Sequence, residues 1–139
     1  MRIRSIKPEF PKSRSMGNVS REARLLFIQL WILADDAGRL WDDPRYLAYA
    51  LYPRDDDAER HIGRWLGELE AQECICRYRN RSASVIAVTN WSRHQKISHP
   101  TRSRIAAPAS EQFDLLGHTA GFTEECGRQS FVRINGGHA

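Results

Sequence analysis

The sequence lacks the long apolar segments that membrane proteins need. It contains no run of about 18 apolar residues, so no membrane span is predicted. Its first residues, Met-Arg-Ile-Arg-Ser-Ile-Lys-Pro, are basic but have no apolar run of the kind found in secretory signals. Cysteine is also scarce, with three in 139 residues. An odd count in a chain that is not cysteine-dense favours a reducing compartment, and we predict the cytoplasm.

Motifs for the common catalytic chemistries are missing as well. There is no phosphate-binding Walker loop, no Gly-x-Ser-x-Gly and no His-Glu-x-x-His. The acidic pairs Asp35-Asp36 and Asp42-Asp43 could bind Mg²⁺ in a nuclease, but they fall where helix ends and helix caps already explain them. The sequence therefore predicts a protein that is not an enzyme and needs no cofactor.

One group of residues invites a zinc interpretation. Cys74, Cys76, His94 and His99 are all possible zinc ligands. Structural zinc sites usually place two to four residues between paired cysteines, whereas a single residue separates these two. Their strand-like surroundings explain both cysteines as small, partly buried side chains. We therefore predict no metal site, with zinc as the alternative.

Acidic residues are absent from Cys74 to Arg104, although this stretch holds seven Lys or Arg. The preceding segment, Glu22 to Glu73, has twelve acids against six Arg. The first 21 residues carry six Lys or Arg against one acid, Glu9. The net charge of +4 is therefore unevenly distributed, with one basic segment before and one after an acidic segment. Clustered Lys and Arg can neutralise phosphates and release counterions, so the leading prediction is a polyanion partner, double-stranded DNA.

The order of predicted elements indicates the fold. Ser20 is a good N-cap for a helix that reaches about residue 34 and is apolar nearly all round, as expected of a buried central helix. A self-association face is the alternative for this helix. The rest of the pattern comprises a short strand at 39–41, helices at 44–51 and 55–72, strands at 74–79 and 84–90, and a hairpin loop at 80–83. This order predicts an α+β fold, a small winged helix-turn-helix with three helices, a short strand and a β-hairpin wing, plus flexible termini.

Composition divides the chain into three parts. Residues 1–19 read as a basic and irregular N-terminal arm, with Ile3, Ile6 and Phe10 available to pack on the body. Residues 20–105 form the predicted winged helix-turn-helix domain, with a basic coil from residue 91. Residues 106–139 read as a loosely ordered C-terminal tail with one helical turn near 113–116.

Several short motifs occur in an order that resembles a known family. They are Arg-Ile-Arg-Ser-Ile-Lys-Pro-Glu-Phe (2–10), Ser-Arg-Glu-Ala-Arg-Leu-Leu-Phe (20–27), Leu-Trp (30–31), Ala-Asp-Asp-Ala-Gly-Arg-Leu (34–40), Asp-Asp-Pro-Arg (42–45), Tyr-Pro (52–53) and Asn-Trp-Ser-Arg-His-Gln (90–95). Together they resemble the N-terminal winged-helix domain of phage and prophage replication proteins of the replisome-organiser or DnaD-like kind. The resemblance covers about residues 1–105. It implies DNA binding in replication initiation or transcription regulation in the cytosol of a bacterial host, with a replication helicase or loader, or a second copy of the chain, as further partners.

The predicted DNA-binding residues come from four segments. In a helix-turn-helix the second helix of the motif enters the major groove. In this chain the second helix of the motif is the one predicted at 55–72. The candidates are Arg60, His61 and Arg64 on this helix, Arg77, Arg79 and Arg81 on the wing, Arg2, Arg4 and Lys7 on the arm, and Arg93, Lys96, Arg102 and Arg104 beyond the hairpin.

Two alternatives remain open for these residues. Asp55, Asp56, Asp57 and Glu59 at the start of the helix would repel phosphates, so the helix could be merely capped and solvated while the wing and arms hold DNA. The arm, in turn, could be only tethered to the body. The alternative for the whole chain is a protein-interaction module, for a replication partner or for dimerisation, without sequence-specific DNA binding.

Overall fold

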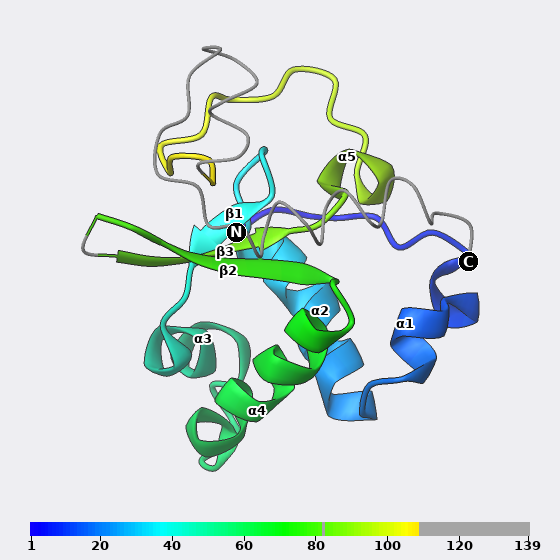
Figure 1. Ribbon diagram of the computed structural model, residues 1–139, viewed down its shortest axis with the longest axis vertical. Coiled ribbons are helices and arrows are strands. Elements are labelled where there is room, and N and C mark those ends of the chain that lie inside the picture. The colour runs from blue at the N-terminus through cyan, green and yellow to red at the C-terminus, as the bar shows by residue number, and fades with distance from the viewer. Residues whose placement is uncertain (82, 109–139) are drawn as a thin grey trace.

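The computed structural model describes residues 1–81 and 83–108 (Figure 1). Within these residues the chain is α+β, with five α-helices, one 3₁₀ turn and a three-stranded antiparallel sheet. No helix in this part of the chain is long and apolar enough to cross a membrane. The elements in chain order are η1 (Phe10–Lys12), α1 (Arg14–Gly17), α2 (Arg21–Leu33), β1 (Arg39–Trp41), α3 (Pro44–Leu51), α4 (Ala58–Ala71), β2 (Ile75–Asn80), β3 (Ala83–Val88) and α5 (Trp91–His94).

The starts of α2 and α3 follow from their capping residues. The Ser20 side chain accepts a hydrogen bond from the backbone N–H of Ala23, at 3.2 Å, and so satisfies one free donor of the first turn of α2. Asp43 accepts hydrogen bonds from the N–H groups of Arg45 and Tyr46, and Pro44 occupies the first helical position of α3. The sequence-based prediction of both helices is confirmed.

Helix α4 begins later than predicted, at Ala58 rather than at Asp55. The backbone before it forms turns, in which Tyr52 accepts from Asp55 and Asp55 accepts from Ala58. The apolar stripe of α4 is buried and packs against α2 and α3. The stripe comprises Ala58, Ile62, Trp65, Leu66 and Leu69.

The sheet has the strand order β1-β3-β2, with both pairs antiparallel. Pairing of β2 with β3 extends to Asn80 opposite Ala83, so the hairpin loop is two residues long and shorter than predicted. Arg81 takes a positive φ of 55°, the conformation that tight two-residue hairpins require. The β2–β3 hairpin projects from the body of the molecule (Figure 1).

The two faces of β3 pack into separate clusters. Ile86 and Val88 join the main core with the helices. Val85 faces the other way and packs with Tyr78 and Ile105. The segment that follows α5 covers this second face, where the Tyr78 hydroxyl donates to the carbonyl of Ala106 at 2.7 Å.

The N-terminal arm is more structured than predicted. It contains η1 and α1, and Met16 and Val19 are buried in the main core. Phe10 packs on Phe27 and Trp31 as expected. Ile3 and Ile6, however, are exposed, so their predicted packing on the body is wrong. Polar contacts, rather than these two side chains, hold the first residues of the arm against the body.

Residues 91–94 were predicted to be coil but form the helix α5. A helix of four residues is too short to show a periodic pattern. Its start at Asn90, which has a φ of 55°, follows directly from the end of the sheet. The predictions for the tail beyond residue 108, including a helical turn near 113–116, lie outside the described residues.

Candidate nucleic-acid interface

Two arginines lie on the exposed face of α4. Arg60 and Arg64 are both exposed and lie one helical turn apart. Gly63 and Gly67 lie on the same face, and a Cβ added at either glycine would meet no atom within 4 Å. The helix therefore presents two cations on a flat surface that a groove or backbone could approach closely.

His61 lies at the edge of this face and is only partly exposed. Its ring stacks on Trp65, with centroids 5.7 Å apart, and its Nε2 is 3.5 Å from the carboxylate of Asp57. Both contacts hold the imidazole against the helix rather than projecting it outward. His61 thus differs from Arg60 and Arg64, which extend into solvent.

The acidic residues that would repel phosphates from α4 cluster at its N-terminal end. Asp55, Asp56, Asp57 and Glu59 are all exposed. They precede the helix or occupy its first turn, where acids interact well with the helix dipole. Arg60 and Arg64 follow directly after these acids along the helix.

The three arginines of the hairpin divide into two groups. Arg79 and Arg81 are exposed, although the Arg79 guanidinium also reaches the Ser84 hydroxyl at 3.4 Å. Arg77 instead forms two short contacts with the carboxylate of Asp42, at 2.6 and 3.1 Å. The hydrogen bond with Asp42 raises the pKa of Arg77. This pair joins β2 to the residue that follows β1, so Arg77 holds the base of the hairpin in place.

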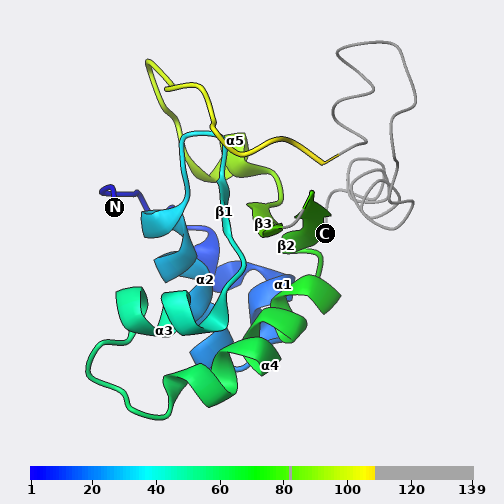
Figure 2. The ribbon, with the colours of Figure 1, turned by 90° about the vertical axis from the view of Figure 1, so that its left-hand side faces the viewer.

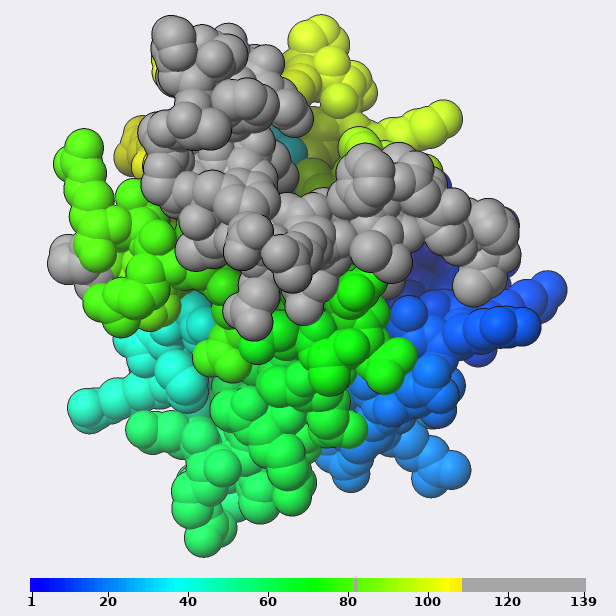
Figure 3. Space-filling view, in the orientation of Figure 1, coloured from blue at the N-terminus to red at the C-terminus, as the bar shows by residue number. Residues whose placement is uncertain are grey.

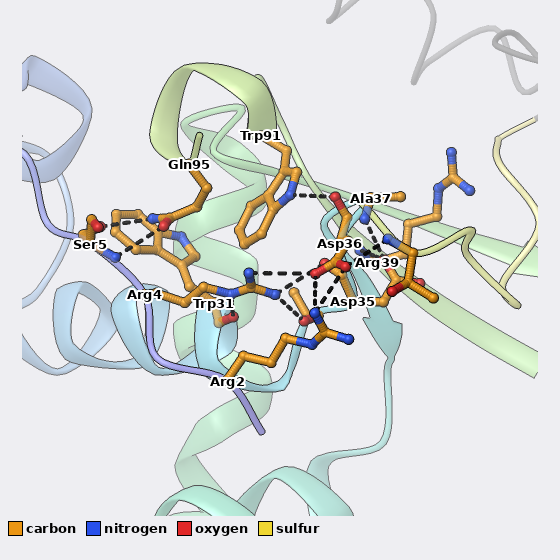
Figure 4. A network of polar contacts seen from close by, with 12 residues as sticks. Arg2, Arg4, Ser5, Trp31, Asp35, Asp36, Ala37, Arg39, Trp91 and Gln95 are labelled. Carbon is orange, nitrogen blue, oxygen red and sulfur yellow. Dashed lines mark hydrogen bonds and ion pairs between the residues drawn. The ribbon is translucent and has the colours of Figure 1, made fainter. Parts of the chain in front are cut away.

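Arg2 and Arg4 are engaged inside the molecule (Figure 4). The Arg4 guanidinium donates to the carbonyls of Trp31 and Ala34, at 2.9 and 2.7 Å, and its side chain is only 7% exposed. These carbonyls lie at the C-terminal end of α2, where a cation is favourable. Burial lowers the pKa of Arg4, and the neighbouring carboxylate of Asp36 opposes that shift. Arg2 pairs with Asp36 at 2.9 Å.

Asp36 is the centre of this polar network. Its carboxylate accepts the backbone N–H of Thr101, at 2.9 Å, and this hydrogen bond lowers the pKa of Asp36. Its backbone carbonyl accepts the indole N–H of Trp91 at 3.0 Å. We call the set Arg2, Arg4, Asp36, Trp91 and Thr101 the arm latch, because it joins the N-terminal arm, the end of α2 and the segment after the sheet.

Sequence reasoning missed the arm latch. It explained Asp35-Asp36 as a helix end and assigned Arg2 and Arg4 to phosphates. The sequence offered one signal for this network, the opposite charge of the basic N-terminal segment and the acidic segment that follows it. That signal does not identify which arginine pairs with which carboxylate. Trp91 is buried in the main core.

The remaining predicted cations are exposed but do not gather at α4. Lys7, Arg93, Lys96, Arg102 and Arg104 are all exposed. The chain that follows α5, which carries most of them, lies at the opposite end of the molecule from α4 in both ribbon views (Figures 1 and 2). The surfaces of α4 and of the projecting hairpin, in contrast, lie on one face (Figure 3).

The described residues contain no cluster of three or more His, Cys, Asp or Glu that could hold a metal ion. Cys74 is buried in the main core, and its thiol donates to the carbonyl of Gln72. His94 packs on Trp31, with ring centroids 5.1 Å apart. These two members of the possible zinc set therefore serve the core.

No family model matches the sequence, and no curated protein or solved structure matches the chain. The resemblance to phage replication proteins therefore stays a prediction.

Proposed function

We propose that this chain is a winged helix-turn-helix protein of phage or prophage type that binds double-stranded DNA. In this proposal α3 and α4 form the helix-turn-helix, α4 is the recognition helix and the β2–β3 hairpin is the wing. The observation that carries the proposal is the element order α2, β1, α3, α4, β2, β3 combined with the strand order β1-β3-β2. The biological role would be replication initiation or transcription regulation.

The exposed face of α4 suits the major groove. A groove about 12 Å wide accepts a helix, and the flat surface at Gly63 and Gly67 would let the helix backbone approach the bases. Arg64 is the candidate for a bidentate contact to guanine, and Arg60 for a phosphate or a base edge. The acidic turn before the helix would lie away from the sugar-phosphate backbone.

The wing would hold the DNA backbone on one side of α4. Arg79 and Arg81 are the exposed cations of the hairpin, and phosphate contacts of this kind set the position of a protein on DNA. The Arg77–Asp42 pair would fix the angle between the wing and the helices. Arg2 and Arg4 are left out of the proposed surface because the arm latch engages both.

The test compares two variants that each remove two positive charges. Arg60→Ala with Arg64→Ala removes the cations of α4, whereas Arg93→Ala with Lys96→Ala removes two exposed cations on and just after α5. Fluorescence anisotropy with a labelled duplex is expected to show a loss of about tenfold or more for the α4 variant and only a few-fold for the control. Equal losses would mean that α4 is not the binding surface. Failure of the wild-type chain to bind duplex DNA at low salt would overturn the proposed function.

A second candidate is a protein-interaction module. One observation favours it, an apolar groove on α2 that nothing in the described residues covers. A replication helicase or loader that bound there would leave α4 free, so the two candidates are compatible. A chain that served only as an interaction module would show no preference among duplex sequences, and substitution of Arg60 and Arg64 would not lower its affinity for its protein partner.

A further inference from the structure

Residues from the N-terminal arm, α2 and α5 line a pocket with a volume of about 330 Å³. This size falls at the lower end of the range of small-molecule sites, roughly 300–1,000 Å³. The lining residues divide by their burial into an apolar floor and a charged rim. Such a division is typical of sites that hold the apolar body of a ligand and fix its polar end.

The floor of the pocket is mainly aromatic. Met16, Phe27 and Trp31 line it and are each at most 2% exposed. The ring of Phe10 is nearly perpendicular to that of Trp31, with centroids 5.9 Å apart, and the ring of His94 is nearly perpendicular to that of Phe27, at 5.8 Å. Offset and edge-to-face contacts are the arrangements that aromatic rings prefer. The aromatic ring of a ligand can therefore join this cluster by the same kind of contact.

Three charged side chains form the rim. Lys7, Glu9 and Arg93 line the pocket and are all exposed. Within the described residues, no ion pair or hydrogen bond engages these three side chains. With His94 neutral, two cations and one carboxylate leave the rim with one surplus positive charge. The rim therefore favours an anionic group over a cationic one, and Glu9 opposes a second negative charge.

The fold joins the two segments that carry the cations of the rim. The Gln95 side chain accepts a hydrogen bond from the backbone N–H of Ser5 at 3.0 Å and donates one to the Ser5 carbonyl at 2.7 Å (Figure 4). Lys7 lies two residues after Ser5, and Arg93 lies two residues before Gln95. The two cations are therefore carried by backbone that is already fixed. A site arranged before binding loses less entropy when it takes up a ligand.

The pocket lies away from the proposed DNA-binding surface. In Figure 1, α1 and α5 lie on the right of the view, whereas the β2–β3 hairpin projects to the left. None of the described residues that line the pocket belongs to α4 or to the hairpin. Occupation of the pocket therefore leaves α4 and the hairpin accessible, and the two sites can be tested separately.

We propose that this pocket binds a small organic anion with a single negative charge and a flat aromatic body, of the class of aromatic carboxylates. The ring of the ligand occupies the floor beside Phe10, Phe27 and Trp31, and its carboxylate lies at the rim with Lys7 and Arg93. Burial of the ring removes apolar surface from water and supplies most of the affinity. The two cations select the charge of the ligand, because a neutral head group gains less from them.

The test measures binding of 2-naphthoate to the full chain by isothermal titration calorimetry, without DNA. The amide 2-naphthamide has the same ring system without the charge and is expected to bind about fivefold more weakly or worse. Lys7→Gln with Arg93→Gln should weaken 2-naphthoate binding about tenfold or more, at up to about fivefold for each exposed cation. Arg102→Gln with Arg104→Gln removes two exposed cations that do not line the pocket, so this matched control should leave the affinity unchanged.

Glu9→Gln changes the rim in the opposite direction and should tighten 2-naphthoate binding about two- to fivefold, because it removes the opposing charge. Lys7, Glu9 and Arg93 are exposed, so the variants should keep the wild-type melting curve. The proposal is overturned by a wild-type chain that does not bind 2-naphthoate at millimolar concentration, by equal affinity for the two ligands, or by equal effects of the two double variants. Weaker binding by Glu9→Gln would also overturn it, since that result indicates a ligand with a positive group.

Discussion

The guanidinium of Arg4 lies over the ring of Trp91, 4.9 Å from the ring centroid. This contact links the first residues of the chain to the first residue of α5. Arg4 simultaneously donates to carbonyl groups at the C-terminal end of α2. One side chain therefore stabilises the positions of three segments that are far apart in the sequence.

Replacing Arg4 tests whether the arm serves the fold or DNA. Arg4→Ala should lower the free energy of unfolding by on the order of 2–3 kcal/mol, because it removes charge-assisted hydrogen bonds to the end of α2. Urea denaturation measures the change. Arg2→Ala is the matched control and should cost less, since that side chain is 53% exposed. If Arg4→Ala left stability unchanged but weakened DNA binding, the arm would be a DNA contact after all.

A buried tyrosine predicts how stability depends on alkaline pH. Burial raises the pKa of Tyr52 to about 12, and Asp55 adds to the shift. The unfolded chain loses this proton near pH 10, whereas the folded chain keeps it to higher pH. The stability that Tyr52 contributes is therefore complete below pH 10 and is lost as pH rises from about 10 to about 12, by at most about 1.4 kcal/mol for each pH unit.

Tyr52→Phe is the control for this alkaline loss. The Tyr52 hydroxyl is buried and has no hydrogen-bond partner within the described residues. The variant should thus be as stable as the wild type at neutral pH and should lose less stability between pH 10 and 12. Unfolding curves recorded across this pH range would show it, and identical slopes for the two proteins would contradict the assignment.

The glycines on α4 predict opposite effects on stability and binding. Gly63→Ala and Gly67→Ala should each stabilise the chain by about 0.5–1 kcal/mol, because alanine is the better helix former and its methyl group meets no atom within 4 Å. If α4 enters a groove, the same methyl groups should weaken DNA binding. Thermal unfolding and anisotropy measured on each variant check both effects. A destabilised variant would mean that the face is covered.

The secondary structure could largely be predicted because its signals are local. Ser20 and Asp43 mark helix starts by side-chain hydrogen bonds that depend on residues two or three positions ahead. The stripe from Ala58 to Leu69 follows a spacing that only one helix face satisfies. These features need no knowledge of the rest of the fold.

The site could be predicted only in part, because charge pairing between distant segments is not visible in a sequence. Arg77 and Arg79 look equivalent on their strand, yet Asp42 pairs with only one of them. Arg4 and Lys7 look equivalent on the arm, yet only Arg4 reaches the end of α2. Which cations pair within the fold is decided by tertiary structure, and such pairing engages three of the thirteen predicted residues, Arg2, Arg4 and Arg77.

The last prediction separates recognition of bases from contact with the DNA backbone. Arg64 extends from the exposed face of α4, whereas Arg81 lies in the hairpin loop. Arg64→Ala should cost about 1–3 kcal/mol on a preferred duplex, found first by selection from random sequences, and less on random DNA. Arg81→Ala should weaken binding to both duplexes about equally and should make the dependence of log K on log[salt] shallower by about one unit.

Both variants should fold normally, since each side chain is exposed. Anisotropy titrations of each variant on the two duplexes at several salt concentrations provide the comparison. If Arg64→Ala weakened binding to both duplexes equally, α4 would contact only phosphates. Sequence preference would then have to come from the shape and deformability of the DNA, because phosphate contacts by themselves carry no sequence information.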